Sequence, residues 1–165
     1  MSKGKKRNND QSLREHLLYL LQGEGAHAPF DEVVKNFPAE LRGAKPEKFS
    51  HTAWMLIEHL RIAQRDILEF CRNSGYAAPK WPDDYWPKKQ APPTPAAWTK
   101  SIQGFKSDSK AMQALVSNPK TDLFARIPWG DEQTILREAL LVADHNAYHL
   151  AQIVDLRRLL GAWEE

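Results

Sequence analysis

The stretch from Gln133 to Trp163 places the strongest constraint on the fold, because its apolar residues recur at helical intervals. Such a pattern is typical of an α-helix that buries one face and exposes the other. The residues on the predicted buried face are Ile135, Val142, Ile153, Leu156 and Leu160. We predict a long amphipathic helix that has Asp131 as its N-cap and ends at Gly161.

Three further segments show helical periodicity, at about residues 10–22, 49–72 and 95–117. Asp10 is a suitable N-cap for the first of them. Thr94 followed by Pro95 predicts the start of the third, because proline is favoured at the first helical position. In the second, we assign Gln64 to the polar face, together with its arginine neighbours.

The connections between these segments are long. Residues 30–37 contain a short apolar patch that predicts a helical turn or two. Residues 76–95 hold six of the eleven prolines, which exclude a regular helix or a central strand. The aromatic side chains of Trp81, Tyr85 and Trp86 indicate that this loop packs onto the body of the protein. With no convincing period-two alternation, the sequence predicts an all-α four-helix bundle with long crossover connections.

Length and composition agree with one globular domain. The chain has 165 residues, of which 42% are hydrophobic and 27% charged. We predict a single domain at residues 10–165, preceded by a disordered basic tail at residues 1–9. A net charge of +2 is too small to indicate binding to nucleic acid or to an anionic membrane, and no apolar run approaches the length of a membrane span.

Cys71 is the single cysteine, so the chain has no internal disulfide. This fits a reducing compartment, and the N-terminus has no hydrophobic signal segment, so we predict a cytoplasmic protein. Nothing near Cys71 in the sequence is arranged to lower the pKa of its thiol. A packed or surface thiol is therefore the preferred interpretation, and a nucleophile the alternative.

Three histidines form the candidate site. His145 and His149 are four residues apart and so are neighbours on one helix surface, at or near its apolar side. His59 lies on the inward face of the helix predicted at residues 49–72. Imidazole nitrogens suit zinc, nickel, copper and iron, and three of them with one open position match a catalytic metal site. The alternative is three core histidines that are hydrogen-bonded to the backbone or to each other.

Other side chains surround this candidate site. His51 precedes His59 by about 12 Å of helix, which is too far to share a ligand, so we place it at the pocket rim. Asp66 and Glu138 lie seven residues from His59 and His145 respectively. Each could orient a metal ligand or act as a general base, although a surface ion pair is the more common role.

Two segments resemble DinB-like (DinB/YfiT) proteins. Residues 137–152, with the sequence REALLVADHNAYHLAQ, are similar to the last-helix signature of this family. Residues 50–70, which contain Trp54 and the sequence EHLRIAQ, are similar to its second helix. The middle region rich in Trp and Pro, and the C-terminal LLGAW, agree as well, so the resemblance covers nearly the whole chain.

This resemblance implies a four-helix bundle of the DinB/YfiT type, often dimeric. It also implies a divalent metal such as zinc or nickel, bound by His59, His145 and His149. Relatives include thiol S-transferases that use bacillithiol or mycothiol, a mycothiol-dependent isomerase and metal-dependent hydrolases. A low-molecular-weight thiol cofactor, a small-molecule substrate and a homodimer are therefore expected.

Close relatives often carry histidine at the position of Trp129, and we place Trp129 at the pocket rim together with Tyr148. Two functions remain open at this point. The first is a metal-dependent hydrolase or thiol S-transferase. The second is a non-catalytic stress or dimerisation protein whose metal is structural or absent, and the aromatic-rich loop favours this alternative because it could cover a partner.

Overall fold

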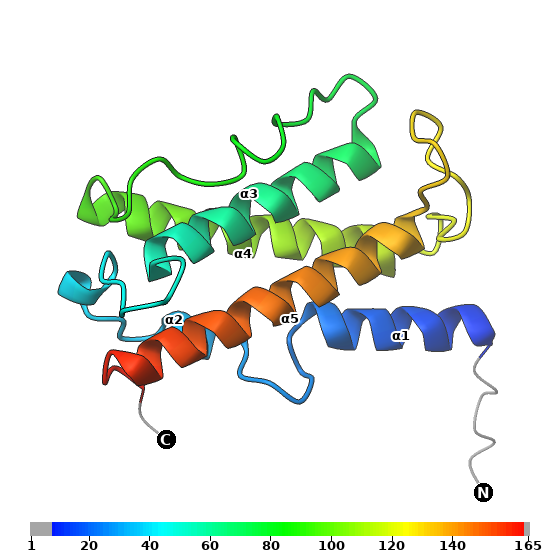
Figure 1. The fold of residues 1–165 in the computed structure, drawn as a ribbon. Coiled ribbons are helices and arrows are strands. Elements are labelled where there is room, and N and C mark those ends of the chain that lie inside the picture. Colours follow the sequence, from blue (N-terminus) through cyan, green and yellow to red (C-terminus); the bar gives the residue numbers. More distant parts are fainter. Residues whose placement is uncertain (1–7, 164–165) are drawn as a thin grey trace, which may run out of the picture.

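The computed structural model describes residues 8–163, and within this range its regular elements are all helices (Figure 1). Its helices are α1 (Asn9–Leu21), α2 (Phe30–Val34), α3 (Ala53–Arg72), α4 (Pro95–Ser117) and α5 (Ile135–Leu159), with a short 3-10 helix at Ala39–Leu41. The sole β-interaction in the described range is an isolated bridge between Arg126 and Thr134. The predicted all-α class is confirmed.

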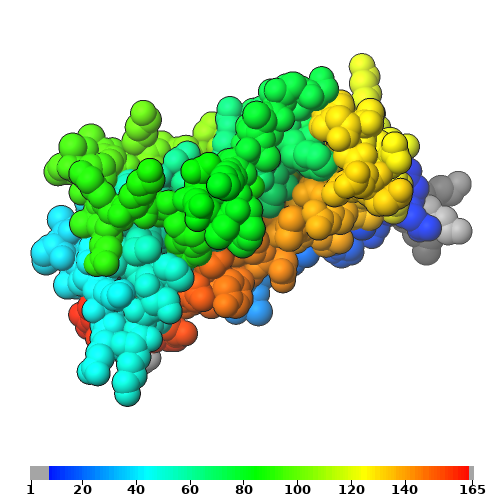
Figure 2. Space-filling view, turned by 45° about the horizontal axis from the view of Figure 1, so that its top comes forward, coloured from blue at the N-terminus to red at the C-terminus, as the bar shows by residue number. Residues whose placement is uncertain are grey.

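Four long helices form the bundle, and α3 packs along both α4 and α5. Helix α1 also packs against α4 and α5, and the short α2 packs on α5. In Figure 1, α3 and α4 run in the same direction, whereas α1 and α5 run in the opposite one. The chain must therefore return along the whole of α3 before α4 begins, and residues 73–94 make this crossover. Figure 2 shows the crossover packed over α3, beside α5.

Several helix ends lie where the sequence predicts them. The Thr94 side chain caps α4, with Pro95 as its first residue. Gly23 and Gly161 follow α1 and α5 with φ of +74° and +66°, a backbone conformation that glycine adopts without strain. Helix α3 begins later than predicted, at Ala53, after the N-cap Thr52.

The predicted N-caps Asp10 and Asp131 were wrong. Helix α1 begins one residue earlier, because the Asn8 side chain accepts a hydrogen bond of 2.7 Å from the Gln11 amide. Helix α5 begins later, after the N-cap Thr134. The residues before Thr134 are held in a turn, in which the amide of Ile127 donates to the carbonyl of Gln133 at 2.8 Å. The predicted basic residues of the tail, at positions 1–7, lie outside the described residues.

Two apolar clusters fill the bundle, one towards each end. The first contains Leu60 of α3 and Leu150 of α5, and the second contains Leu68 of α3 and Val142 of α5. Between them lies a layer of polar side chains, which we call the polar layer. Its members are His59, Gln64, His145, Asn146 and His149. The candidate site thus lies in the middle of the bundle, where two apolar clusters meet.

The N-cap of α5 can be tested by substitution. Thr134→Ala removes the side chain that accepts a hydrogen bond from the Arg137 amide at 3.2 Å. We expect it to lower the free energy of unfolding by about 1 kcal/mol, measured by urea denaturation. Asp131→Ala is the matched control and should change stability by less than about 0.5 kcal/mol. The reverse order of effects would mean that α5 begins at Asp131.

Candidate metal centre

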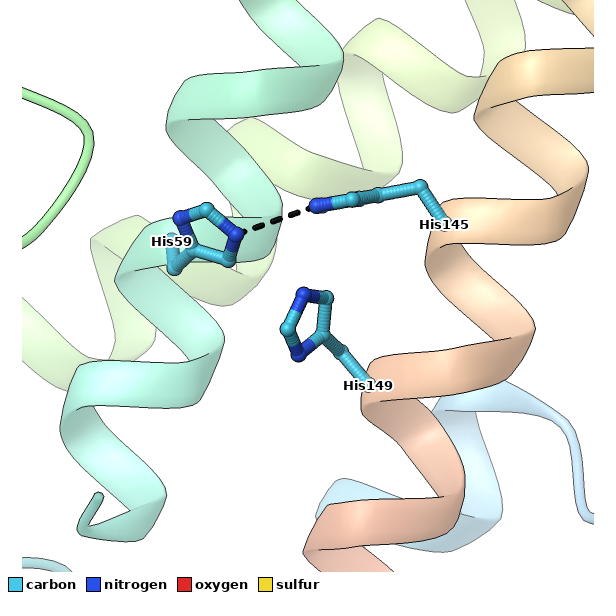
Figure 3. A group of neighbouring side chains, drawn as sticks. All are labelled: His59, His145 and His149. Atoms are coloured by element: carbon cyan, nitrogen blue, oxygen red, sulfur yellow. Dashed lines mark hydrogen bonds between the residues drawn. The ribbon is translucent and has the colours of Figure 1, made fainter. Parts of the chain in front are cut away.

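Three imidazole rings from two helices meet in the polar layer (Figure 3). Helix α3 supplies His59, and α5 supplies His145 and His149, all three of which point into the space between the helices. The Nε2 atoms of His59 and His145 are 3.0 Å apart. One nitrogen from each of the three rings lies within 4.8 Å of the others. The structure therefore brings the three predicted ligands together.

The partners of two outer ring nitrogens fix where His59 and His149 carry their protons. The Nδ1 atom of His59 lies 2.9 Å from the Tyr85 carbonyl oxygen, and that of His149 lies 2.7 Å from the Gln152 amide oxygen. Because these oxygens only accept, both Nδ1 atoms carry the proton. In a neutral ring the Nε2 atom then keeps its lone pair, which is the form that binds a metal ion.

Burial keeps these rings neutral. It lowers the pKa of His59 to about 4, although the Tyr85 carbonyl opposes the shift. Burial and the neighbouring imidazole of His149 lower the pKa of His145 to about 4. Burial also lowers the pKa of His149. Near pH 7 the cluster is therefore uncharged, and the three rings together need no net loss of a proton to bind an ion.

The crossover provides one wall of the site through Trp86. Its ring stacks on His59 with a centroid distance of 3.9 Å, and on His51 with a centroid distance of 4.1 Å. Two rings cannot stack this closely on the same face of one indole, so His51 and His59 lie on opposite faces of Trp86. His51 is thereby separated from the cluster by an aromatic ring, as expected of a residue outside the ligand set.

Asp66 acts on the cluster through Tyr85 and does not contact His59 directly. Its carboxylate accepts a hydrogen bond of 2.6 Å from the Tyr85 hydroxyl. Burial, followed by this hydrogen bond, raises the pKa of Tyr85, so the hydroxyl remains a donor. The Tyr85 carbonyl in turn accepts from His59. Asp66 therefore anchors the segment of the crossover that orients a ring of the cluster.

Two other predicted site residues lie elsewhere. Glu138 is buried and forms an ion pair with Arg137 at 2.7 Å. It lies on α5 seven residues before His145, which corresponds to about 10 Å along the helix axis. Trp129 donates its indole N–H to the carbonyl of Phe70, near the end of α3. Phe70 is eleven residues after His59, which corresponds to about 16 Å along the helix axis. The structure thus does not bring either residue to the histidines.

Tyr148 lies at the outer edge of the cluster. Its ring packs edge-on to His149 with a centroid distance of 4.9 Å, and the side chain is 63% exposed. The histidines therefore lie just below the surface on this side, while Trp86 covers them on another. Tyr148 therefore lies beside His149 at the surface of the protein.

A separate cavity of about 200 Å³ lies among α1, α4 and α5. Its lining includes Phe30, Phe105, Lys110 and Leu150, and it contains none of the three histidines. Helix α5 contributes Asn146 to this lining. The cavity is therefore distinct from the histidine cluster, and Asn146 lies between the two.

Sequence reasoning did not find several residues that support the cluster: Gln64, Tyr85, Trp86 and Asn146. The aromatic content of the crossover indicated packing, but not which helix it would cover. Gln64 was wrongly assigned to the polar face, since only 1% of it is exposed. Its amide donates to the Phe105 carbonyl at 2.7 Å, so a backbone group of α4 satisfies it inside the bundle.

Comparison with known families agrees with this architecture. A model of the DinB superfamily matches residues 22–153, which include all three histidines. The chain therefore belongs to the DinB superfamily. Comparisons with the curated proteins and with the solved structures give no match. Within the described residues, no helix has the length and apolar character needed to span a membrane.

The link from Asp66 to the cluster can be tested with Tyr85→Phe. Loss of the hydroxyl leaves the part-buried carboxylate without this donor, so we expect the free energy of unfolding to fall by about 1–3 kcal/mol in urea denaturation. Tyr148→Phe, at an exposed position, should change it by less than about 0.5 kcal/mol. Equal effects of the two variants would contradict the anchoring role of Asp66.

The interpretation of Cys71 as a packed thiol can also be tested. Cys71 is buried, and burial together with the nearby Glu138 raises the pKa of its thiol to about 12. Almost no thiolate is present at pH 8, so we expect the native protein to react with Ellman's reagent far more slowly than the urea-unfolded protein. Rapid stoichiometric reaction of native protein would instead indicate an accessible, activated thiol.

Proposed function

We propose that this protein is a metal-dependent enzyme of the hydrolase or thiol S-transferase type. His59, His145 and His149 would bind one divalent ion such as zinc or nickel. The observation that carries the proposal is the convergence of the three rings, with two Nε2 atoms 3.0 Å apart in the polar layer. Three imidazole ligands with an open position are typical of catalytic sites, whereas structural zinc sites are usually closed by four protein ligands.

The donor set fits such an ion. Imidazole is a ligand for zinc and nickel, and here all three rings are neutral, with the lone pairs of His59 and His149 on their Nε2 atoms. When bound, the ion supplies a Lewis acid that lowers the pKa of a water molecule or thiol at its open position. The protein supports the ligands through the Tyr85 carbonyl and the Gln152 amide oxygen, which fix the orientation of two rings.

The surrounding side chains define how a small-molecule substrate would reach the site. Trp86 excludes water from one face of His59, because its indole covers the ring at 3.9 Å. Access is from the side of the exposed Tyr148, whose ring can contact an apolar part of a substrate. Neither Asp66 nor Glu138 contacts the rings in this structure, so we assign proton transfer to neither residue.

The alternative, a non-catalytic binding or dimerisation protein, has less support. The aromatic-rich crossover suggested a surface that covers a partner. In the structure, Trp86 packs on His51 and His59, and Tyr85 binds Asp66, all within the same chain. These two aromatic side chains are therefore used to build the histidine cluster.

The proposal predicts stoichiometric metal in protein prepared without a histidine tag, measured by elemental analysis. His149→Ala should lose most of this metal, because the two remaining imidazole ligands, His59 and His145, would bind a divalent ion only weakly. Metal at 100 times its dissociation constant should raise the free energy of unfolding of the wild type by about 2.7 kcal/mol, and of the variant by much less.

His16→Ala is the matched control, since His16 is exposed on α1. It should retain the metal and the stabilisation of the wild type. Full metal occupancy in His149→Ala would reject the proposed ligand set. If metal binds but neither ester hydrolysis nor binding of a low-molecular-weight thiol is detected, the non-catalytic alternative is preferred.

A further inference from the structure

The polar layer contains two buried atoms that lack hydrogen-bond partners. They are Nδ1 of His145 and Oδ1 of the adjacent Asn146. A buried polar atom without a partner is costly, because it has lost its hydrogen bonds to water, so such an atom calls for an explanation. The corresponding Nδ1 atoms of His59 and His149 both have acceptors. His145 is therefore the exception among the three rings.

The positions of the protons explain the exception. Because Nδ1 of His59 donates to Tyr85, its Nε2 atom can only accept in a neutral ring. In the 3.0 Å contact between the two Nε2 atoms, His145 must then be the donor. A neutral His145 with its proton on Nε2 has a lone pair on Nδ1. A lone pair cannot bond to Oδ1 of Asn146, which is also an acceptor.

A chain of amides fixes which atom Asn146 presents. The Phe105 carbonyl can only accept, so the NH₂ group of Gln64 must face it, at 2.7 Å. The oxygen of Gln64 is then directed to the NH₂ group of Asn146, at 2.8 Å. Asn146 is thereby left with its oxygen as the free atom. A backbone carbonyl of α4 thus determines the orientation of an amide on α5.

We propose that Asn146 positions His145 as a metal ligand by accepting a hydrogen bond from Nδ1 of the imidazole, and that Gln64 holds the carboxamide in the required orientation. This inference rests on the proposed function. Ligation through Nε2 requires the proton of His145 on Nδ1, so one proton leaves Nε2, one is gained at Nδ1, and the ring stays neutral. Both partnerless atoms are then satisfied together.

The contacts of Gln64 and the chemistry of the ring partners agree with this assignment. Gln64 is 1% exposed and connects three helices of the bundle, since it lies on α3 and bonds to α4 and α5. The partners of all three ligand rings are then neutral oxygens, two from amide side chains and one from a backbone carbonyl.

The experiment combines metal affinity with imidazole NMR. Zinc affinity, from competition with a chromophoric chelator, should fall about 10–100-fold in Asn146→Leu. Gln64→Leu should weaken it less, and the double variant should match Asn146→Leu, because Gln64 acts through Asn146. Gln113→Leu is the control, since its amide also donates to a backbone carbonyl of another helix, that of Leu21.

Imidazole ¹H–¹⁵N spectra of the wild type test the same inference without a substitution. His145 should carry its proton on Nε2 in metal-free protein and on Nδ1 after zinc is added, whereas His59 and His149 keep theirs on Nδ1. Unchanged zinc affinity in Asn146→Leu, or no change of tautomer at His145, would overturn the inference alone. Failure of the wild type to bind zinc would overturn the proposed function, and this inference with it.

Discussion

The stability of the fold depends on hydrogen bonds to the buried groups of the polar layer, in the middle of an otherwise apolar bundle. Each buried group without a partner would cost about 1–3 kcal/mol, a large part of the stability of a domain of this size. Gln64 meets this constraint by bonding to the Phe105 carbonyl and to Asn146. These bonds connect α3 to α4 and α5, so the polar layer also fixes how the three helices are positioned.

The parallel arrangement of α3 and α4 explains why the crossover supports the site. A connection that must travel the length of α3 can place side chains along it. The crossover is fixed at its end by the Thr52 hydroxyl, which donates to the Gln90 carbonyl at 2.6 Å, and by the close approach of Ala91 to Gly43. Earlier in the crossover, Tyr85 and Trp86 reach His59. The parallel topology of α3 and α4 thus requires the connection that supplies Tyr85 and Trp86 to the site.

Helical periodicity was sufficient to predict the four long helices and the inward-facing side of each of the three histidines, because both depend on local spacing. The density of prolines predicted the long connection at residues 76–95. Neither pattern predicted which residues support the rings. Asp66 reaches the cluster only through Tyr85, a residue 19 positions away. Gln64 was misplaced because the polarity of a side chain does not reveal a backbone acceptor on another helix. Partners that depend on tertiary packing leave no signal in the spacing of residues.

Among residues 8–163, no carboxylate contacts the three rings, and this bears on the proposed chemistry. The partners of His59 and His149 are a carbonyl and an amide oxygen, which do not carry charge. A carboxylate partner would make an imidazole a stronger electron donor to the metal ion, and neutral oxygens do so less. Three neutral imidazole ligands therefore leave the charge of a divalent ion largely uncompensated. An uncompensated charge favours an anionic group at the open position. Both a thiolate and the deprotonated form of water meet this requirement, which is why hydrolysis and thiol transfer remain the two chemistries that suit the site.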